Sequence, residues 1–191
     1  MTSSGTVIGC GYTTREPFNS ATAASTAGTY AVQVTTAATK GTKTAGAVHA
    51  ATLTAAENLT INNVVVALDA GFDEAATVAR INQYSAQTGV TASVANNKIT
   101  LTQDNFGSAH SVTVFSDKAA ANQSGIDTTA LTDAGSDVAG TINGAAATGV
   151  GNVLTGSAGI TTGISVTTLV TTDNTAAGNV IVTNAGPQFQ I

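Results

Sequence analysis

Alternation of apolar and polar residues, interrupted by Asn- and Gly-rich turns, recurs along this sequence and restricts it to a fold built mainly of β-strands. The clearest run follows Gly28, where Tyr30, Val32 and Val34 alternate with smaller or more polar residues. A period of two places these three side chains on one face of a half-buried strand. After residue 126 the sequence is nearly free of helix signals, and it predicts short strands at 138–142, 164–170 and 180–182.

Two hairpins are predicted in the middle of the chain. Aliphatic and β-branched residues flank Asn62-Asn63 within 59–68, and Asn96-Asn97 separates strands predicted at 90–94 and 99–101. Asparagine tolerates the left-handed backbone of tight turns, so a turn is expected at each pair. A further strand is predicted at 111–115.

One amphipathic helix is predicted between the two hairpins, over 73–87. Asp73 can cap its first turn, and Glu74 complements the positive end of the helix dipole. Apolar residues then recur at helical spacing up to Gly89, which suits the left-handed position just past a helix end. The contact expected between the helix and its sheet involves Val78, Ile81, Val90, Val94 and Leu101.

These elements predict an α+β protein that is mostly β: a small antiparallel sheet with one packed helix, and a second β-rich unit. The simplest division is a lead-in segment at 1–24, an α+β unit at 25–125 and a β-rich unit at 126–191. Alternatively, the strand at 29–35 completes the second unit, because a chain that inserts one unit into another often closes the outer unit last. The stretch at 36–50 is compatible with a strand pair or a loop.

Composition argues against a typical cytoplasmic enzyme. Charged residues make up 9% of the chain, against about 25% in an ordinary domain. The net charge of −5, with six Lys and Arg, offers no basic surface for nucleic acid. No apolar run approaches the roughly 18–20 residues that span a bilayer, and the first residues lack the pattern of a secretory signal. The 42% hydrophobic content argues against a disordered linker.

No residue pattern predicts a catalytic, cofactor-binding or metal site, and we expect neither enzyme activity nor a cofactor. Cys10 has no second cysteine to pair with and no basic neighbour. His49 and His110 lack partners at metal-ligand spacing and are assigned to loops. The Gly149-Val-Gly151 stretch lacks the third glycine of a dinucleotide site and is assigned to a β-turn. Three carboxylates fit either a calcium site or a solvated loop: Asp127, Asp133 and Asp137.

Four consecutive segments carry a family resemblance: Leu59-Thr-Ile-Asn-Asn-Val-Val-Val, Ala75-Ala-Thr-Val-Ala-Arg-Ile81-Asn82, Thr88-Gly89-Val90-Thr-Ala-Ser93 and Lys98-Ile-Thr-Leu-Thr102. Together they resemble the flagellin hook IN motif, which recurs in bacterial flagellins, in the filament-cap protein and in hook-associated proteins. The stretch between Asp133 and Gly156 is similar to the segment that commonly follows this motif, and Gly28-Thr-Tyr-Ala-Val-Gln-Val-Thr35 is similar to the strand that often precedes it.

The resemblance implies an extracellular structural segment of the bacterial flagellum, whose partners are other filament subunits. The final residues, Gly186-Pro-Gln-Phe-Gln-Ile191, resemble the point where flagellins re-enter their inner domain, which favours flagellin slightly over the cap protein. The long terminal helices that polymerise flagellins are missing, so an excised outer segment is expected that stays soluble and grows no filaments. By the same resemblance, Ser and Thr hydroxyls on loops are candidates for O-linked sugars.

A second hypothesis is an adhesin-like β-module that binds carbohydrate or another host surface. Sugar sites usually place aromatic side chains for stacking. The sequence contains three Tyr, five Phe and no Trp, thinly scattered, which favours the structural role.

Overall fold

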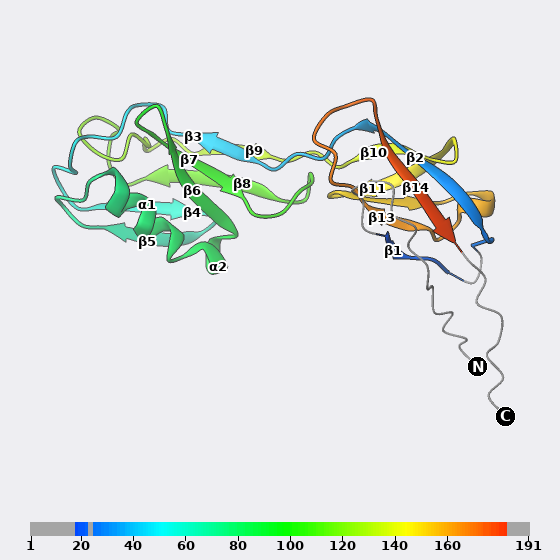
Figure 1. Ribbon diagram of the computed structural model, residues 1–191. Helices are drawn as coiled ribbons and strands as arrows, with labels where there is room; N and C mark the ends of the chain where they lie inside the picture. Colours follow the sequence, from blue (N-terminus) through cyan, green and yellow to red (C-terminus); the bar gives the residue numbers. More distant parts are fainter. Residues whose placement is uncertain (1–17, 23–24, 183–191) are drawn as a thin grey trace, which may run out of the picture. The chain divides into compact units, whose positions relative to one another are not determined.

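The computed structural model describes residues 18–22 and 25–182 and is mostly β, with antiparallel sheets and little helix. The chain divides into two compact units. Unit 2 is the continuous segment Lys40–Ser136, and unit 1 combines residues 1–39 with residues 137–191 (Figure 1). Unit 2 is therefore inserted into unit 1.

Unit 2 contains two sheets that share one hydrophobic core. The three-stranded sheet has the order β3 (Thr42–Thr44), β7 (Lys98–Gln103) and β6 (Val90–Ala95). The four-stranded sheet has the order β5 (Val64–Leu68), β4 (Glu57–Ile61), β8 (Ser111–Ser116) and β9 (Leu131–Ala134). The core draws residues from both sheets, including Leu59 and Val112 from the larger and Ile99 and Leu101 from the smaller.

Both predicted hairpins are present, and each turns at its Asn-Asn pair. Asn62 and Asn63 have φ values of 46° and 67°, and Asn96 and Asn97 have values of 54° and 57°. Two successive positive φ values define the type I′ turn, whose twist matches that of the flanking strands. The hairpins nevertheless belong to different sheets, since β4 pairs with β5 and β8 whereas β7 pairs with β6 and β3.

The predicted single helix is divided in two. Helix α1 spans Glu74–Asn82, with the Asp73 carboxylate accepting a hydrogen bond from the Ala76 amide at 2.8 Å as its N-cap. A short α2 follows at Ser85–Thr88 and ends at Gly89, whose φ of 68° is left-handed as expected. The interruption follows Asn82, whose side chain binds the backbone of β6. Asn82 and Tyr84 are also weak helix formers.

The predicted contact between the helix and its sheet is wrong at one residue, Val94. Ile81, Val90 and Leu101 are fully buried in the core and Val78 packs against it, as expected, but Val94 is 41% exposed. Strand β6 continues past the end of the core, and its last residues from Ser93 onward face solvent. Period-two alternation therefore continues beyond the buried part of the strand.

Unit 1 consists of one seven-stranded sheet. Its order is β1 (Phe18–Ser20), β13 (Ser165–Thr167), β12 (Val153–Gly156), β11 (Ala145–Val150), β10 (Ala139–Ile142), β2 (Gly28–Thr36) and β14 (Thr175–Val182), with a 3-10 turn, η1, at Gly159–Thr161. One face supplies the buried side chains, among them Tyr30, Val32, Ile142, Leu154 and Val166. The described part of unit 1 has no α-helix, so strands and the segments that connect them are what can cover these side chains.

The Gly149-Val-Gly151 stretch, which the sequence assigns to a β-turn and not to a dinucleotide site, lies in the β11–β12 hairpin. Gly151 has a φ of 58° in this turn, and the turn prediction is confirmed. Gly149 is needed for a different reason: a Cβ atom there would lie 1.6 Å from the Val138 carbonyl oxygen. Only a residue without a side chain permits this close backbone approach.

Because unit 2 is inserted into unit 1, the boundaries lie at 39/40 and 136/137. The simplest division of the sequence places them at 24/25 and 125/126. Strand β2, which includes residues 29–35, pairs with β14 and β10, so it belongs to unit 1. The alternative in which this strand completes the second unit is confirmed. Of the stretch 36–50, residues Thr42–Thr44 form β3 and most of the remainder is irregular.

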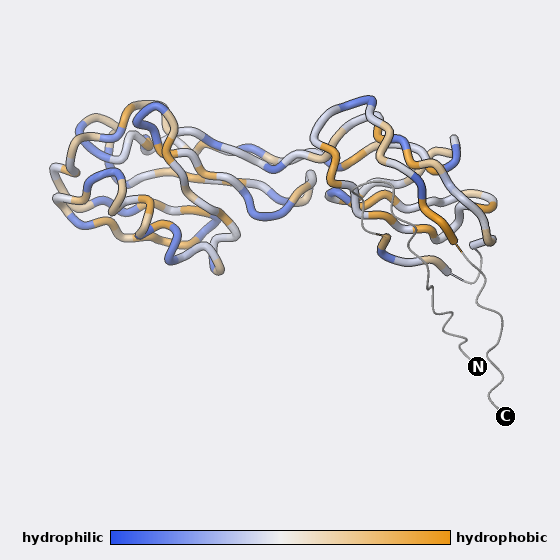
Figure 2. The backbone as a smooth tube through the Cα atoms, in the orientation of Figure 1, coloured by the Kyte–Doolittle hydropathy of each residue, from blue (hydrophilic) through white to orange (hydrophobic). Residues whose placement is uncertain are grey.

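Hydropathy follows this strand pattern rather than any long apolar segment (Figure 2). Hydrophobic and hydrophilic residues are interspersed along the strands of both units. Among the described residues, no helix has the length and apolar character needed to cross a membrane.

Candidate interaction surfaces

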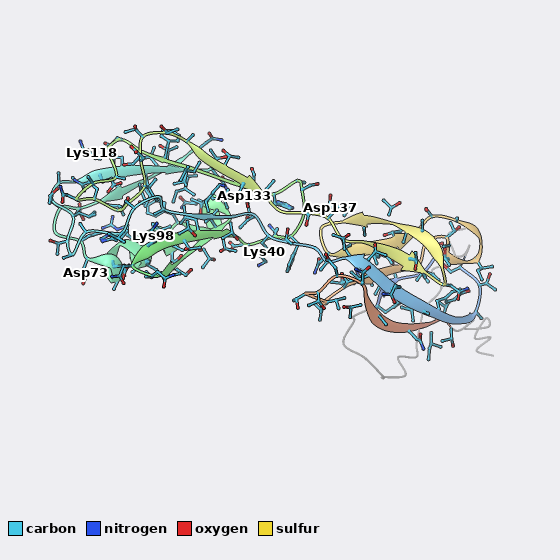
Figure 3. The ribbon with its side chains drawn as sticks, turned by 90° about the horizontal axis from the view of Figure 1, so that it is seen from above. Lys40, Asp73, Lys98, Lys118, Asp133 and Asp137 are labelled. Atoms are coloured by element: carbon cyan, nitrogen blue, oxygen red, sulfur yellow. The ribbon has the colours of Figure 1, made fainter. Side chains whose placement is uncertain are left out.

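The three carboxylates considered for a cation do not come together. Asp133 accepts a hydrogen bond from the Thr42 amide at 2.9 Å, and Asp127 accepts one from the amide that follows it at 2.7 Å. Asp137 belongs to unit 1, where it accepts from the Gly151 amide at 2.7 Å (Figure 3). Within the described ranges, no three His, Cys, Asp or Glu side chains form a group suited to a metal ion.

The two histidines have different environments. His49 lies in a loop, as expected, but it is buried, and its Nε2 is 2.9 Å from the Thr77 hydroxyl while its Nδ1 contacts the Ala50 carbonyl oxygen. It therefore ties its loop to α1. His110 is exposed and uses its backbone carbonyl to accept from the Gly135 amide. Cys10 lies outside the described residues.

Glu57 is a buried carboxylate that sequence reasoning missed. Its Oε1 accepts from the Ser116 and Ser124 hydroxyls at 2.7 and 2.6 Å, and its Oε2 accepts from the Ser124 amide at 3.0 Å. All three residues are at most 2% exposed. The signal was present, because Glu57 shares the period of two with Leu59 and Ile61 and so points inward with them. These bonds attach the loop after β8 to the first residue of β4.

Side chains close the open edge of β6. The register with β7 directs the backbone groups of Val90 and Ala92 away from the sheet. The Asn82 amide reaches from α1 to both groups of Ala92, donating to its carbonyl at 3.1 Å and accepting from its N–H at 2.7 Å. The Thr88 hydroxyl accepts from the Val90 N–H at 3.2 Å and shares its single hydrogen between the carbonyl oxygens of Tyr84, at 3.1 Å, and Val90, at 3.4 Å. The side chains of Asn82 and Thr88 thus bind backbone groups of β6 that a neighbouring strand would otherwise pair with.

The edge of β5 is also closed from α1. The Arg80 guanidinium donates to the outward carbonyl of Ala67 at 3.4 Å, pairs with Asp69 at 3.3 Å and lies over the Phe72 ring, 5.3 Å from its centroid. Charged side chains at a sheet edge discourage pairing with another chain. Helix α1 therefore protects both strands that it packs on.

The outer face of the four-stranded sheet is an exposed, uncharged surface. Cross-strand pairing aligns Val65, Thr60 and Phe115 in one row across β5, β4 and β8, with Val65 57% and Phe115 36% exposed. Beside this row, the hydroxyls of Thr113 and Thr132 are 3.1 Å apart. The strands point no charged residue outward here. This face therefore presents one exposed aromatic ring among threonine hydroxyls.

Asp117 lies just past β8 and binds Asn58 of the neighbouring strand β4. The Asn58 backbone amide donates to it at 2.8 Å and the Asn58 side-chain amide donates at 3.0 Å. The backbone bond is the main reason why the pKa of Asp117 lies below its usual value, with smaller contributions from the side-chain bond and from Lys118. Asp117 therefore stays ionised and attaches the chain after β8 to β4.

Solved structures with a similar fold are of flagellar cap proteins. The chain is similar to the D2–D3 domains of the flagellar cap protein FliD from Serratia marcescens, with a TM-score of 0.55 and 19% identity over 87% of this chain and 99% of that one. The D2–D3 domains of FliD from Escherichia coli give a TM-score of 0.52 and 22% identity over 85% of this chain and 94% of that one. No family model and no curated protein sequence matches the chain.

At these identities the likeness establishes a shared fold. It spans both units, because 87% coverage exceeds the share of the chain that either unit provides alone. The chain therefore shares its fold with the D2–D3 domains of flagellar cap proteins, and the surfaces described above lie on that fold.

Proposed function

We propose that this chain is a non-enzymatic, outward-displayed segment of an extracellular bacterial flagellar protein, with a structural role and with other flagellar subunits as its partners. The observation that carries the proposal is the similarity to FliD D2–D3 domains over nearly the whole of those domains. The segments that resemble the hook IN motif support it independently, because they form β4, β5, α1, β6 and β7 of unit 2.

The proposal covers two alternatives, a flagellin and a filament-cap protein. The solved structures are of cap proteins, whereas the last residues of the chain resemble flagellin. The low charge of the surface suits either one, since dense packing of subunits outside the cell is easier when neighbouring surfaces repel little.

Immunogold electron microscopy with antibodies against this chain tests the role on the cells that produce it. Label along the whole filament identifies a flagellin, and label confined to the filament tip identifies a cap protein. Cells without the gene serve as the control. Label restricted to the cell body or cytoplasm would contradict the proposal.

A second candidate function is binding of carbohydrate at the outer face of the four-stranded sheet. The exposed Phe115 ring, next to the hydroxyls of Thr60 and Thr113, is the observation that favours it. A glycan array probed with the full chain and with Phe115→Ala tests it, with Val48→Ala, also on an exposed side chain, as the matched control. Binding that is equal for all three proteins, or absent for all three, would exclude this face as a sugar site.

A further inference from the structure

Open sheet edges are a hazard that proteins usually protect, and this chain protects nearly all of those that the structure describes. In unit 2, the β5 and β6 edges are closed from α1 by Arg80 and Asn82. The β3 and β9 edges are three and four residues long, and β9 contains the charged Asp133. In unit 1, β1 has three residues. Short strands and charged side chains both limit pairing with another chain.

Strand β14, at the other edge of the unit 1 sheet, differs from these. It runs for eight residues, Thr175–Val182, and contains neither a charged residue nor a proline. It pairs with β2 on one side and is the last strand of the sheet on the other. A bulge near Gly178 is its single irregularity and lies before the half of the strand that ends at Val182.

The register shows which backbone groups of β14 face outward. The Ala31 carbonyl accepts from Asn143, so Ala31 directs its backbone toward β10, and its neighbour Tyr30 directs its own toward β14. Tyr30 is opposite Val180, which therefore bonds inward. Since backbone direction alternates along a strand, Asn179 and Ile181 point their N–H and C=O groups away from the sheet. No side chain among the described residues bonds to these groups.

We propose that this edge is a homotypic docking site, at which β14 of one copy pairs antiparallel with β14 of a second copy. A two-fold axis at Val180 places Asn179 of each copy opposite Ile181 of the other, so that all four outward groups of each strand segment are paired. The occupant is a second copy because the outward N–H and C=O groups of one β14 strand pair fully with the same groups of another. It also brings no like charges together in a chain whose net charge is −5.

The size of the contact sets its strength. One pair of edge strands buries far less than the roughly 1,200–2,000 Å² of a stable interface, so the isolated chain forms a weak dimer, with a dissociation constant on the order of 0.1–1 mM. High local concentration in an array raises occupancy without any new contact. The pairing itself does not depend on the proposed flagellar role.

Two substitutions target the edge without removing bonds inside the sheet. Ile181→Lys adds a charge to a side chain that is 37% exposed, and Asn179→Pro removes an N–H that β2 does not use. Val65→Lys is the matched control, because it puts the same charge on an exposed valine of an edge strand that Arg80 already protects. Circular dichroism melts check that each variant folds.

Sedimentation over a concentration series up to about 1 mM, together with amide exchange by NMR, tests the proposal. We expect a dimer that both edge variants weaken at least tenfold and the control leaves unchanged, and slower exchange at Asn179 and Ile181 as concentration rises. If Asn179→Pro does not fold, Ile181→Lys and the exchange data decide. A monomer at every concentration, or protection of these amides that is independent of concentration because the same chain covers the edge, overturns the proposal.

Discussion

Truncation of Ile81 measures how much the α1 contact contributes to unit 2. Ile81 is fully buried on the face of α1 that packs on β6 and β5. Ile81→Ala removes three carbons, worth about 0.8 kcal/mol each in transfer free energy, or about 2.4 kcal/mol. The cavity adds to this, and the higher helix propensity of Ala offsets a few tenths. We expect a loss of about 3 kcal/mol, within the 2–5 kcal/mol seen for such substitutions.

Differential scanning calorimetry and urea unfolding are the assays. For a unit of about 100 residues, 1 kcal/mol shifts the melting temperature by about 4–8 °C, so the transition of unit 2 should fall by at least about 12 °C. Val65→Ala, at a side chain that is 57% exposed, is the control and should change stability by less than about 1 kcal/mol. An Ile81→Ala loss below about 0.5 kcal/mol would refute the assigned packing of this helix.

Three smaller tests address single interactions. Asn82→Ala removes both hydrogen bonds to the β6 edge, so urea melts should show a loss of about 1–3 kcal/mol and light scattering should show more association on heating. Gly149→Ala should destabilise unit 1 by several kcal/mol in thermal melts, while Gly46→Ala, with open space around its Cβ, stays within about 0.5 kcal/mol. The lowered pKa of Asp117 means that its contribution to stability is present above the unfolded pKa and is lost as the pH falls below about 4. Asn58→Ala keeps the backbone N–H and removes only the side-chain bond, so an NMR titration should find the pKa only slightly raised. Full return of the pKa to its usual value in this variant would contradict the main role assigned to the backbone bond.

Local chemistry in the sequence determined the elements of this protein. Asn62-Asn63 and Asn96-Asn97 favour type I′ turns whichever sheet their strands join, because asparagine tolerates the two positive φ values that this turn requires. Asp73 and Gly89 likewise mark the two limits of the helical segment through a cap and a left-handed residue. Each of these features depends on neighbours within a few positions, so the pattern of residues was enough to predict them.

The tertiary structure decided everything that depends on residues far apart in the chain. The insertion of unit 2, the burial of His49 and Glu57 and the exposure of Val94 all follow from which strands pair, and period-two alternation cannot specify that. The break after α1 and the closure of β6 by Asn82 follow from the position of a strand edge ten residues away. The outward backbone of β14 has the same origin: alternation predicts which side chains are buried, whereas strand order alone determines which hydrogen-bonding groups are left at an edge.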